Sequence, residues 1–421
     1  MKKVCILLIV FLLGVGVGFL QNPRICVAQA PNEIRIGVTA PLTGPAAENG
    51  IGLKEGMILA VEEWNAKGGI YIKEAGKNLP IKILIEDEQS KPEIGVAQAE
   101  KLITRDKVHV LLGDALHSSV TLAIMELAPK YGIPIMSVEA VSSEIAKKVA
   151  TNPDRYWSYW KGLFNSEAYG KSIFYTYKSF LDKGLFKAKN KSIAFIAEDT
   201  DYGRSNSQKT SELFTGIGWK TLTLETVPLG YTDFYPQLTK IKAMNPDILA
   251  VVFSNLSSGT AYTKQFQEVG MKCGHFGIYF PLRPEFIPQV GKAGDYLLWT
   301  PHLIDPTRIP SHRAFAEKVK KRWNVPVNTD HAWGYDAVNN MCDSIKKAGS
   351  LDPKAIVGTL SKLDNKGILA RYVFDQKDHT IIDGEDFHPV PAAQIQNGKH
   401  VMVWPPALAV GTYQQPPWIK D

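Results

Sequence analysis

The chain has 421 residues, of which 45% are hydrophobic and 21% are charged, so it holds enough apolar material for two ordinary domains. It contains no low-complexity tract, and this composition excludes a largely disordered protein. The net charge is +6, three of the positive charges lie at Lys2, Lys3 and Arg24, and no long basic run occurs, which argues against a nucleic-acid-binding protein.

Residues 1–30 have the features of a secretory signal peptide. Lys2 and Lys3 form a positive end, Val4–Leu20 is apolar, and Ala28-Gln29-Ala30 offers a small-x-small cleavage site. We therefore expect export and cleavage after this site. An uncleaved membrane anchor is the alternative, because the apolar stretch is about as long as a short membrane span.

The first folding unit is Glu33–Gly69. Apolar residues alternate over 34–38, which predicts a strand, and a loop of small residues follows over 40–50. Apolar residues then recur every three or four positions over 53–64, as on one face of a helix, and Gly68 is suited to end that helix. In an open α/β sheet, such a loop lies at the carboxyl edge of the strands, where ligands bind.

Strand and helix signals continue to alternate along the chain. Strands are predicted at 81–85, 108–112 and 132–136, with helices at 94–104 and from Ser119 to Lys130. After the irregular aromatic segment 152–161, further strands are predicted at 192–197, 221–227, 247–253 and 275–280, with helices between them. Later, 297–301 is strand-like, 314–323 and 332–347 are helical, and 367–375 and 394–403 suit antiparallel strands. This order predicts two α/β units, each with a mostly parallel sheet.

The order of these motifs resembles a known family. The first strand, the loop Pro41–Pro45 (PLTGP), the long amphipathic helix and its ending Asn65–Gly69 (NAKGG) open the type I periplasmic solute-binding proteins of ABC importers. The resemblance runs from about residue 33 to about 405, and it is strongest to the branched-chain amino acid (Leu/Ile/Val) binding branch.

The resemblance implies a two-lobed α/β fold, in which each lobe is a mostly parallel sheet flanked by helices and the chain crosses between the lobes three times. We place the crossings near Tyr156–Gly162, Leu298–Ile304 and Ala370–Asp375. Lobe 1 then comprises 31–157 plus 302–371, and lobe 2 comprises 158–301 plus 372–421. A small ligand would bind in the cleft between the lobes, which would close on it by hinge motion.

In the first lobe, the family holds the ligand carboxylate with a serine at the start of a helix. The resemblance places this role at Ser118, with His117 and Ser119 open as alternatives one residue away. The spacing alone allows a different reading, in which Ser118 or Ser119 only caps the helix.

The next loop of the first lobe departs from the family pattern. The family supplies a backbone carbonyl and a threonine here, and the corresponding stretch is Glu139, Ala140 and Val141. Val141 lacks the threonine hydroxyl, whereas Glu139 adds a carboxylate. The alternative for Glu139 is a solvated loop residue.

In the second lobe, the resemblance implies three further ligand contacts. Tyr202 matches a tyrosine that covers the ligand, Asn255 matches a cleft side chain, and Tyr279 stands where the family has a glutamate for the ligand ammonium. Tyr202 could instead be wedged between lobe and loop. From the first lobe, Asn49 replaces a tryptophan above the side-chain pocket. The specificity residues thus match less well than the scaffold.

Two further features each allow a structural as well as a functional interpretation. The aromatic cluster 156–160 could line a pocket or pack around a hinge, and Arg283 could meet an anionic ligand or lie on the surface. Cys273 and Cys342 would lie in different lobes, so we expect two buried free thiols. No Cys/His cluster suggests a metal.

No catalytic or nucleotide-binding motif is present in the sequence, so we expect a binding protein without enzymatic activity or a cofactor. Taken with the resemblance, these observations predict a monomeric periplasmic protein that delivers a small polar ligand to an ABC permease in the inner membrane. A ligand-sensing subunit of a membrane receptor or regulatory system is the alternative. We do not expect a preference for leucine, isoleucine or valine.

Overall fold

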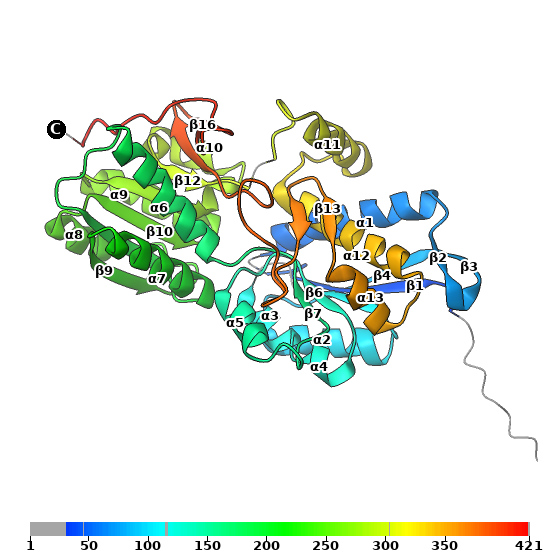
Figure 1. Cartoon of the computed structure of the whole chain (residues 1–421). Coiled ribbons are helices and arrows are strands. Elements are labelled where there is room, and N and C mark those ends of the chain that lie inside the picture. The colour runs from blue at the N-terminus through cyan, green and yellow to red at the C-terminus, as the bar shows by residue number, and fades with distance from the viewer. Residues whose placement is uncertain (1–30, 45, 114–116, 303, 420–421) are drawn as a thin grey trace, which may run out of the picture.

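The computed structural model describes residues 31–44, 46–113, 117–302 and 304–419. Figure 1 shows two α/β halves, each built around its own sheet. The predicted signal peptide, residues 1–30, lies outside the described residues. No helix in the described part of the chain is long and apolar enough to cross a membrane.

The first half is centred on a five-stranded sheet. Its strands, in spatial order, are β4 (Ile81–Asp87), β1 (Ile34–Ala40), β5 (Val110–Gly113), β6 (Ile135–Ser137) and β7 (Tyr159–Lys161). All neighbouring pairs are parallel, so the carboxyl ends of the strands share one edge. Most residues of β1 and all residues of β5 and β6 are buried, as expected for strands covered on both faces.

Helices from both ends of the chain cover this sheet. They are α1 (Ala47–Ala66), α2 (Pro92–Thr104), α3 (Ser118–Ile124), α4 (Leu127–Tyr131), α5 (Ser143–Thr151), α11 (Pro310–Trp323), α12 (Thr329–Ala348) and α13 (Pro353–Leu360). Two small hairpins flank them: β2 (Ile70–Ile72) with β3 (Lys77–Leu79), around η1 (Lys73–Ala75), and β13 (Asp364–Lys366) with β14 (Arg371–Val373).

Helices α1 and α12 lie side by side (Figure 1), and glycines allow their close approach. A Cβ atom on Gly56 would lie 1.9 Å from the His331 carbonyl oxygen, and one on Gly334 would lie 2.1 Å from the Leu53 carbonyl oxygen. No side chain fits at those distances, so the backbone contact requires glycine on each helix. This contact fixes the position of α12 relative to the first sheet.

The second half is centred on a seven-stranded sheet. Its strands, in spatial order, are β16 (Lys399–Trp404), β15 (Ala392–Gln396), β12 (Leu298–Thr300), β11 (Gly274–Tyr279), β10 (Ile248–Phe253), β8 (Ser192–Glu198) and β9 (Lys220–Val227). The β12–β15 and β15–β16 pairs are antiparallel and the other pairs are parallel. Its helical segments are α6 (Glu167–Asp182), α7 (Asp201–Gly216), α8 (Tyr235–Met244), α9 (Leu256–Val269), η2 (Phe280–Leu282), α10 (Phe286–Val290) and η3 (Gly291–Gly294).

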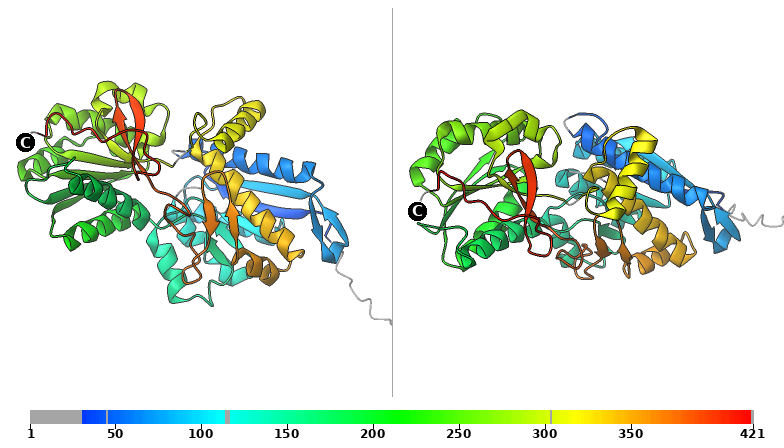
Figure 2. Two further views of the ribbon diagram at one scale, coloured as in Figure 1. Left: turned by 45° about the horizontal axis from the view of Figure 1, so that its top comes forward. Right: turned by 90° about the horizontal axis from the view of Figure 1, so that it is seen from above.

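The chain leaves the first half after β7, returns between β12 and α11, and leaves again between β14 and β15 (Figure 2). Two predicted lobe boundaries do not match the observed strands: one lies before the last strand of the first sheet, and the other lies inside a strand. Tyr159–Lys161 was expected in lobe 2, but it pairs with Ile135–Ser137 in the first sheet. The boundary between residues 371 and 372 falls within β14.

The aromatic residues of the cluster 156–160 pack within the first half and around its exit. Trp160 stacks on His379 with ring centroids 4.2 Å apart, and Tyr159 donates to the Ser137 hydroxyl at 2.9 Å. Phe164, His302 and His388, one from each passage between the halves, contact one another through their rings. The aromatic cluster therefore has the packing role and does not form a separate aromatic pocket.

Some sequence expectations were wrong in detail. The single helix expected up to Lys130 is two helices, α3 and α4, separated at Met125 and Glu126. The segment expected to be irregular ends in β7, because its backbone pairs with β6. Cys273 and Cys342 are buried and free, which confirms the expected thiols.

Candidate functional site

A cavity of about 240 Å³ lies between the two halves. It is formed at the carboxyl ends of β5, β6 and β7 from the first sheet and of β8, β10 and β11 from the second sheet, together with α6 and α12. Its lining residues are His117, Ser118, Ser119, Glu139, Val141, Leu163, Tyr169, Glu198, Asp199, Thr200, Asp201, Tyr202, Arg204, Ser254, Tyr279 and Trp333. Both sheets therefore present their ligand-binding edge to one cavity.

Ser118 and Ser119 both line this cavity from the start of α3, beside His117. His117 is the N-cap residue of α3, and no side chain caps the helix, so the capping role considered for the serines is wrong. The Ser118 hydroxyl instead accepts a hydrogen bond from the Ser142 amide at 3.1 Å. Burial lowers the pKa of His117, which keeps its imidazole neutral near pH 7.

Glu139 and Val141 line the cavity after β6. Glu139 is only 3% exposed, so the alternative of a solvated loop residue is wrong. Ala140 points elsewhere and packs in the hydrophobic cluster beneath α3 and α5. The cavity thus receives a carboxylate and an isopropyl group from this loop.

Glu198 and Tyr202 approach the cavity from the second half. Glu198 ends β8 and accepts hydrogen bonds from the Ser254 amide at 2.8 Å and the Ser254 hydroxyl at 2.9 Å. Burial, partly offset by these bonds, raises the pKa of the Glu198 carboxyl to about 7. Tyr202 packs edge-on against Tyr169, and its hydroxyl has no hydrogen-bond partner among the described residues.

Tyr279 lies at the end of β11 with φ of 74° and ψ of −54°, a strained conformation for a residue other than glycine. Its hydroxyl oxygen accepts hydrogen bonds from the Asn49 side-chain amide at 2.5 Å and from the Arg283 guanidinium at 3.3 Å. Arg283 also forms an ion pair with Asp330 at 3.1 Å. Asn49 donates to Asp330 as well, at 3.1 Å.

This network joins the halves, because Asn49 and Asp330 belong to α1 and α12 whereas Tyr279 and Arg283 belong to the second half. Arg283 is 6% exposed, so the expectation of a surface arginine is wrong. Nor does it line the cavity: its guanidinium is bound by protein carboxylates, and Asp330 and Glu48 help to raise its pKa. The Asn49 side chain is hydrogen-bonded to Tyr279 and Asp330 beside the cavity, and Asn49 is not one of the residues that line it.

Asn255 also lies outside the cavity lining. It is the N-cap residue of α9, and its side-chain oxygen accepts hydrogen bonds from the Ser258 amide at 2.9 Å and the Ser257 hydroxyl at 2.8 Å. The adjacent Ser254 reaches the cavity instead. The three-residue spacing from Asn255 to Ser258 is typical of a helix cap, and it is the signal that favours this role.

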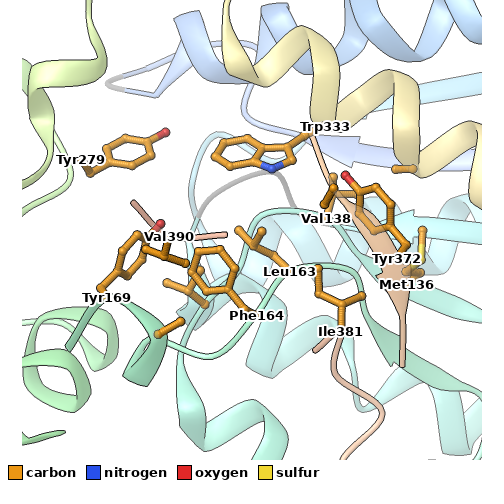
Figure 3. Packing of buried hydrophobic residues seen from close by; sticks show 14 of the residues in the cluster. Met136, Val138, Leu163, Phe164, Tyr169, Tyr279, Trp333, Tyr372, Ile381 and Val390 are labelled. Atoms are coloured by element: carbon orange, nitrogen blue, oxygen red, sulfur yellow. The ribbon is translucent and has the colours of Figure 1, made fainter. Parts of the chain in front are cut away.

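Helices contribute aromatic walls that the sequence analysis missed. Tyr169 comes from α6 and Trp333 from α12, and both are about 2% exposed. Figure 3 shows Tyr279 and Trp333 on one side of a common space, with Tyr169 and Phe164 on the other. Tyr169 shares a 2.7 Å hydrogen bond with His302, whereas the Trp333 indole nitrogen has no partner among the described residues.

A cavity enclosed by two α/β halves, and built from the carboxyl edges of both sheets, defines a two-domain ligand-binding protein. Comparison with known protein families supports this assignment. The chain belongs to the periplasmic binding protein family, whose model matches residues 33–399.

Relatives and solved structures extend this result. The chain is similar to a Leu/Ile/Val-binding protein homologue of Brucella suis, with 23% identity over 92% of this chain and 96% of the relative. The isoleucine complex of a branched-chain amino acid substrate-binding protein from Streptococcus pneumoniae has a TM-score of 0.72 and 24% identity, covering 87% of this chain and 97% of the other. The benzoate complex of a solute-binding protein from R. palustris has a TM-score of 0.71 and 18% identity, and the match covers 88% of this chain and 95% of the other. These likenesses establish the fold.

Proposed function

We propose that this protein is the extracytoplasmic substrate-binding component of an ABC importer, which captures one small polar solute between its halves. The main support is the cavity itself, with buried Glu139 on one side and buried Glu198 on the other. Two similar solved structures are named as binding proteins of transporters, which favours this role over the sensing alternative.

The proposed ligand contacts from the sequence are Ser118, Ser119, Glu139, Val141, Tyr202 and Tyr279, to which we add Tyr169, Glu198 and Trp333. We retain the two-lobe division, with the first boundary moved to follow Lys161 and the last moved to follow β14. A solute that contacts both halves binds the closed arrangement better than an open one, so it shifts the population toward closure.

The proposed partners are the solute and a permease in the inner membrane, and the proposed location is the periplasm after removal of residues 1–30. We propose a monomer that releases its solute unchanged and has no enzymatic activity. Recovery of the bound solute by mass spectrometry, after long incubation with purified protein, tests the last point.

A thermal-shift screen tests the function. The panel contains amino acids, amides, polyamines, aromatic acids and amines, each at high concentration. A solute at 100 times its Kd adds about 2.7 kcal/mol to the free energy of unfolding, which gives an easily measured rise in Tm. Calorimetry should then give one solute per chain. If no solute in a broad panel raises the Tm, the proposal fails.

We expect leucine, isoleucine and valine to bind weakly. An α-ammonium buried between the halves needs a carboxylate, and Tyr279 occupies the position where the resemblance implies one. Glu139 and Glu198 could serve instead, but the α-carboxylate of leucine would then lack a cationic partner. Arg204, the one described cation of the lining, is already paired with Asp199 and Asp201. Submicromolar binding of leucine that survives Glu139→Gln would contradict this expectation.

A further inference from the structure

Building on the proposed function, we propose that the captured solute is an organic cation: an amine on an aromatic or similarly flat apolar body, without a carboxylate. Two buried carboxylates, Glu139 and Glu198, would pair with the cation from opposite halves, and aromatic rings would enclose the body. The charge of the cavity wall, its aromatic rings and its hydrogen-bonding atoms without a partner each favour such a solute.

The charge of the cavity wall is strongly negative. Its described lining contains four carboxylates, those of Glu139, Glu198, Asp199 and Asp201, and one guanidinium, that of Arg204. Arg204 forms ion pairs with both Asp199 and Asp201, and it is half-exposed. Among the described lining residues, therefore, no cation remains to pair with a carboxylate on the solute. Among the described residues, the buried Glu198 carboxyl accepts hydrogen bonds from the neutral groups of Ser254 and Thr200. Its ionised form is costly in this setting, and a cationic solute would supply a positive partner.

Aromatic rings make up much of the remaining wall. Tyr169, Tyr202, Tyr279 and Trp333 all line the cavity. The Tyr169 hydroxyl shares a hydrogen bond with His302, and the Tyr279 hydroxyl accepts hydrogen bonds from Asn49 and Arg283. These bonds hold the two rings in place. Aromatic faces attract ammonium groups, and the attraction grows when water is excluded.

Three hydrogen-bonding groups of the wall have no partner among the described residues. They are the Trp333 indole nitrogen, which can only donate, the Tyr202 hydroxyl and the His117 Nδ1 atom. Trp333 is 2% exposed, so a bare indole N–H there carries a desolvation cost. The solute should therefore carry a neutral acceptor in addition to its ammonium, or bring a water molecule that accepts. The cavity of about 240 Å³ restricts it to a small molecule.

The test compares three probes with the same phenyl body. 2-Phenylethylamine carries only the amine, 3-phenylpropionate only the carboxylate, and phenylalanine carries both. We expect calorimetry to give a Kd for the amine at least tenfold lower than for the other two. Glu139→Gln and Glu198→Gln should each raise the Kd of the amine about tenfold, whereas the control Glu212→Gln, on the exposed face of α7, should leave it unchanged.

A second measurement uses the unmodified protein and does not depend on the folding of a variant. The groups that face the Glu198 carboxyl are Ser254 and Thr200, which donate to it, and Tyr202. Because the pKa of this carboxyl is about 7, a cation bound beside it favours ionisation and releases protons at pH 7. Calorimetry of the amine in two buffers with different ionisation enthalpies measures that release. Proton uptake would overturn the proposal.

The outcomes separate this inference from the proposed function. Tighter binding of phenylpropionate or phenylalanine than of the amine would overturn the cationic class and leave a solute-binding protein. The same holds if none of the three binds while an anionic or neutral solute of the wider panel does. Equal affinity of the amine for the wild type and both glutamine variants would also overturn it. If nothing in the panel binds, the proposed function fails and this inference fails with it.

Discussion

At the scale of single residues, the site contains groups that reduce the stability of the protein without ligand. Glu198 is a buried carboxyl, Tyr279 has a strained backbone, and the Tyr202 hydroxyl has no partner among the described residues. Each feature costs free energy in the ligand-free protein, and each can be relieved or compensated by a bound solute. Mutations at such positions should therefore move stability and affinity in opposite directions.

The first prediction concerns Glu198→Gln. The pKa of the Glu198 carboxyl is raised from 4.5 to about 7, so the folded protein binds this proton more tightly than the unfolded chain does. The stabilisation by the proton is fully present below pH 4.5 and is lost as the pH rises to 7. At pH 8 the glutamine variant should be more stable than the wild type by up to about 3 kcal/mol, and near pH 4.5 the difference should vanish.

Chemical denaturation at pH 8 and pH 4.5 measures this difference. Glu212→Gln is the control, because Glu212 lies on the solvent side of α7. A difference between wild type and Glu198→Gln that does not depend on pH would show that burial of the charge is not its cause.

The second prediction concerns Tyr202→Phe. Removal of a buried hydroxyl without a protein partner should raise the stability of the ligand-free protein slightly, by about 1 kcal/mol or less. Affinity for the best solute of the screen should fall roughly threefold to tenfold, the usual worth of one hydrogen bond. Calorimetry and thermal unfolding measure the two effects.

Tyr262→Phe is the matched control for Tyr202→Phe. Its hydroxyl is also buried without a partner among the described residues, but Tyr262 lies in the core of the second half and not in the cavity wall. The Tyr262→Phe substitution should therefore have little effect on solute affinity or on the free energy of unfolding. Equal affinity of Tyr202→Phe and wild type would exclude a polar role for Tyr202.

The residues that follow strands could be predicted from the sequence, because parallel strands end at one edge of a sheet. Glu139 and Tyr202 both follow strands, but the resemblance to the family is what singled them out as ligand contacts, and those contacts remain a prediction. Tyr169 and Trp333 could not be found in this way. They lie on helices, and which helix face meets the other half depends on packing between distant segments.

At the scale of elements, α12 is the part that connects core and cavity. It packs against α1 through Gly334, and it carries Asp330 into the network between the halves and Trp333 into the cavity wall. The spacing of apolar residues predicted α1 and α12 as helices. It did not predict that they contact each other, because the spacing of glycines in one helix does not identify the helix that packs against it. The helix α6 also follows apolar residues at helical spacing, including Ile173, Tyr177 and Phe180, which the predicted pattern of elements did not use.

The third prediction concerns Gly334→Ala. The added methyl group would lie 2.1 Å from the Leu53 carbonyl oxygen, so α1 and α12 must separate, and the free energy of unfolding should fall by about 1–3 kcal/mol or more. Because Trp333 and Asp330 move with α12, affinity should fall too. Gly358→Ala is the control: Gly358 lies in α13 with no atom near the new methyl group, so this change should stabilise by about 0.5–1 kcal/mol. Equal effects of the two substitutions in denaturant titrations would contradict the packing argument.

At the scale of the whole molecule, the buried pair Arg283–Asp330 holds the two halves together beside the cavity. Asp330 is fully buried and Arg283 is 6% exposed, so the loss of one partner leaves a buried charge without compensation. Separation of the halves would return that charge to water. The pair thus biases the protein toward the arrangement seen in Figure 2.

The fourth prediction follows from this pair. Arg283→Ala should shift the ligand-free protein toward a more open arrangement, since removal of one partner of a buried ion pair costs about 3–5 kcal/mol. Small-angle scattering should show a larger radius of gyration, and solute affinity should fall at least tenfold. Arg371→Ala removes an exposed pair with Asp364 within one hairpin and should change neither quantity. An unchanged radius of gyration for Arg283→Ala would show that the pair does not hold the halves together.

The partnership of α1 and α12 also has a consequence for the order in which the protein can fold during synthesis. Helix α1 ends at Ala66, whereas α12 begins at Thr329, after every parallel strand of the second sheet has been made. The ribosome therefore releases the first sheet long before the helix that covers it, and its apolar surface stays exposed until translation is nearly complete. For the export that we propose, this delay would be useful, because it would keep the nascent polypeptide unfolded enough to pass through a secretion channel.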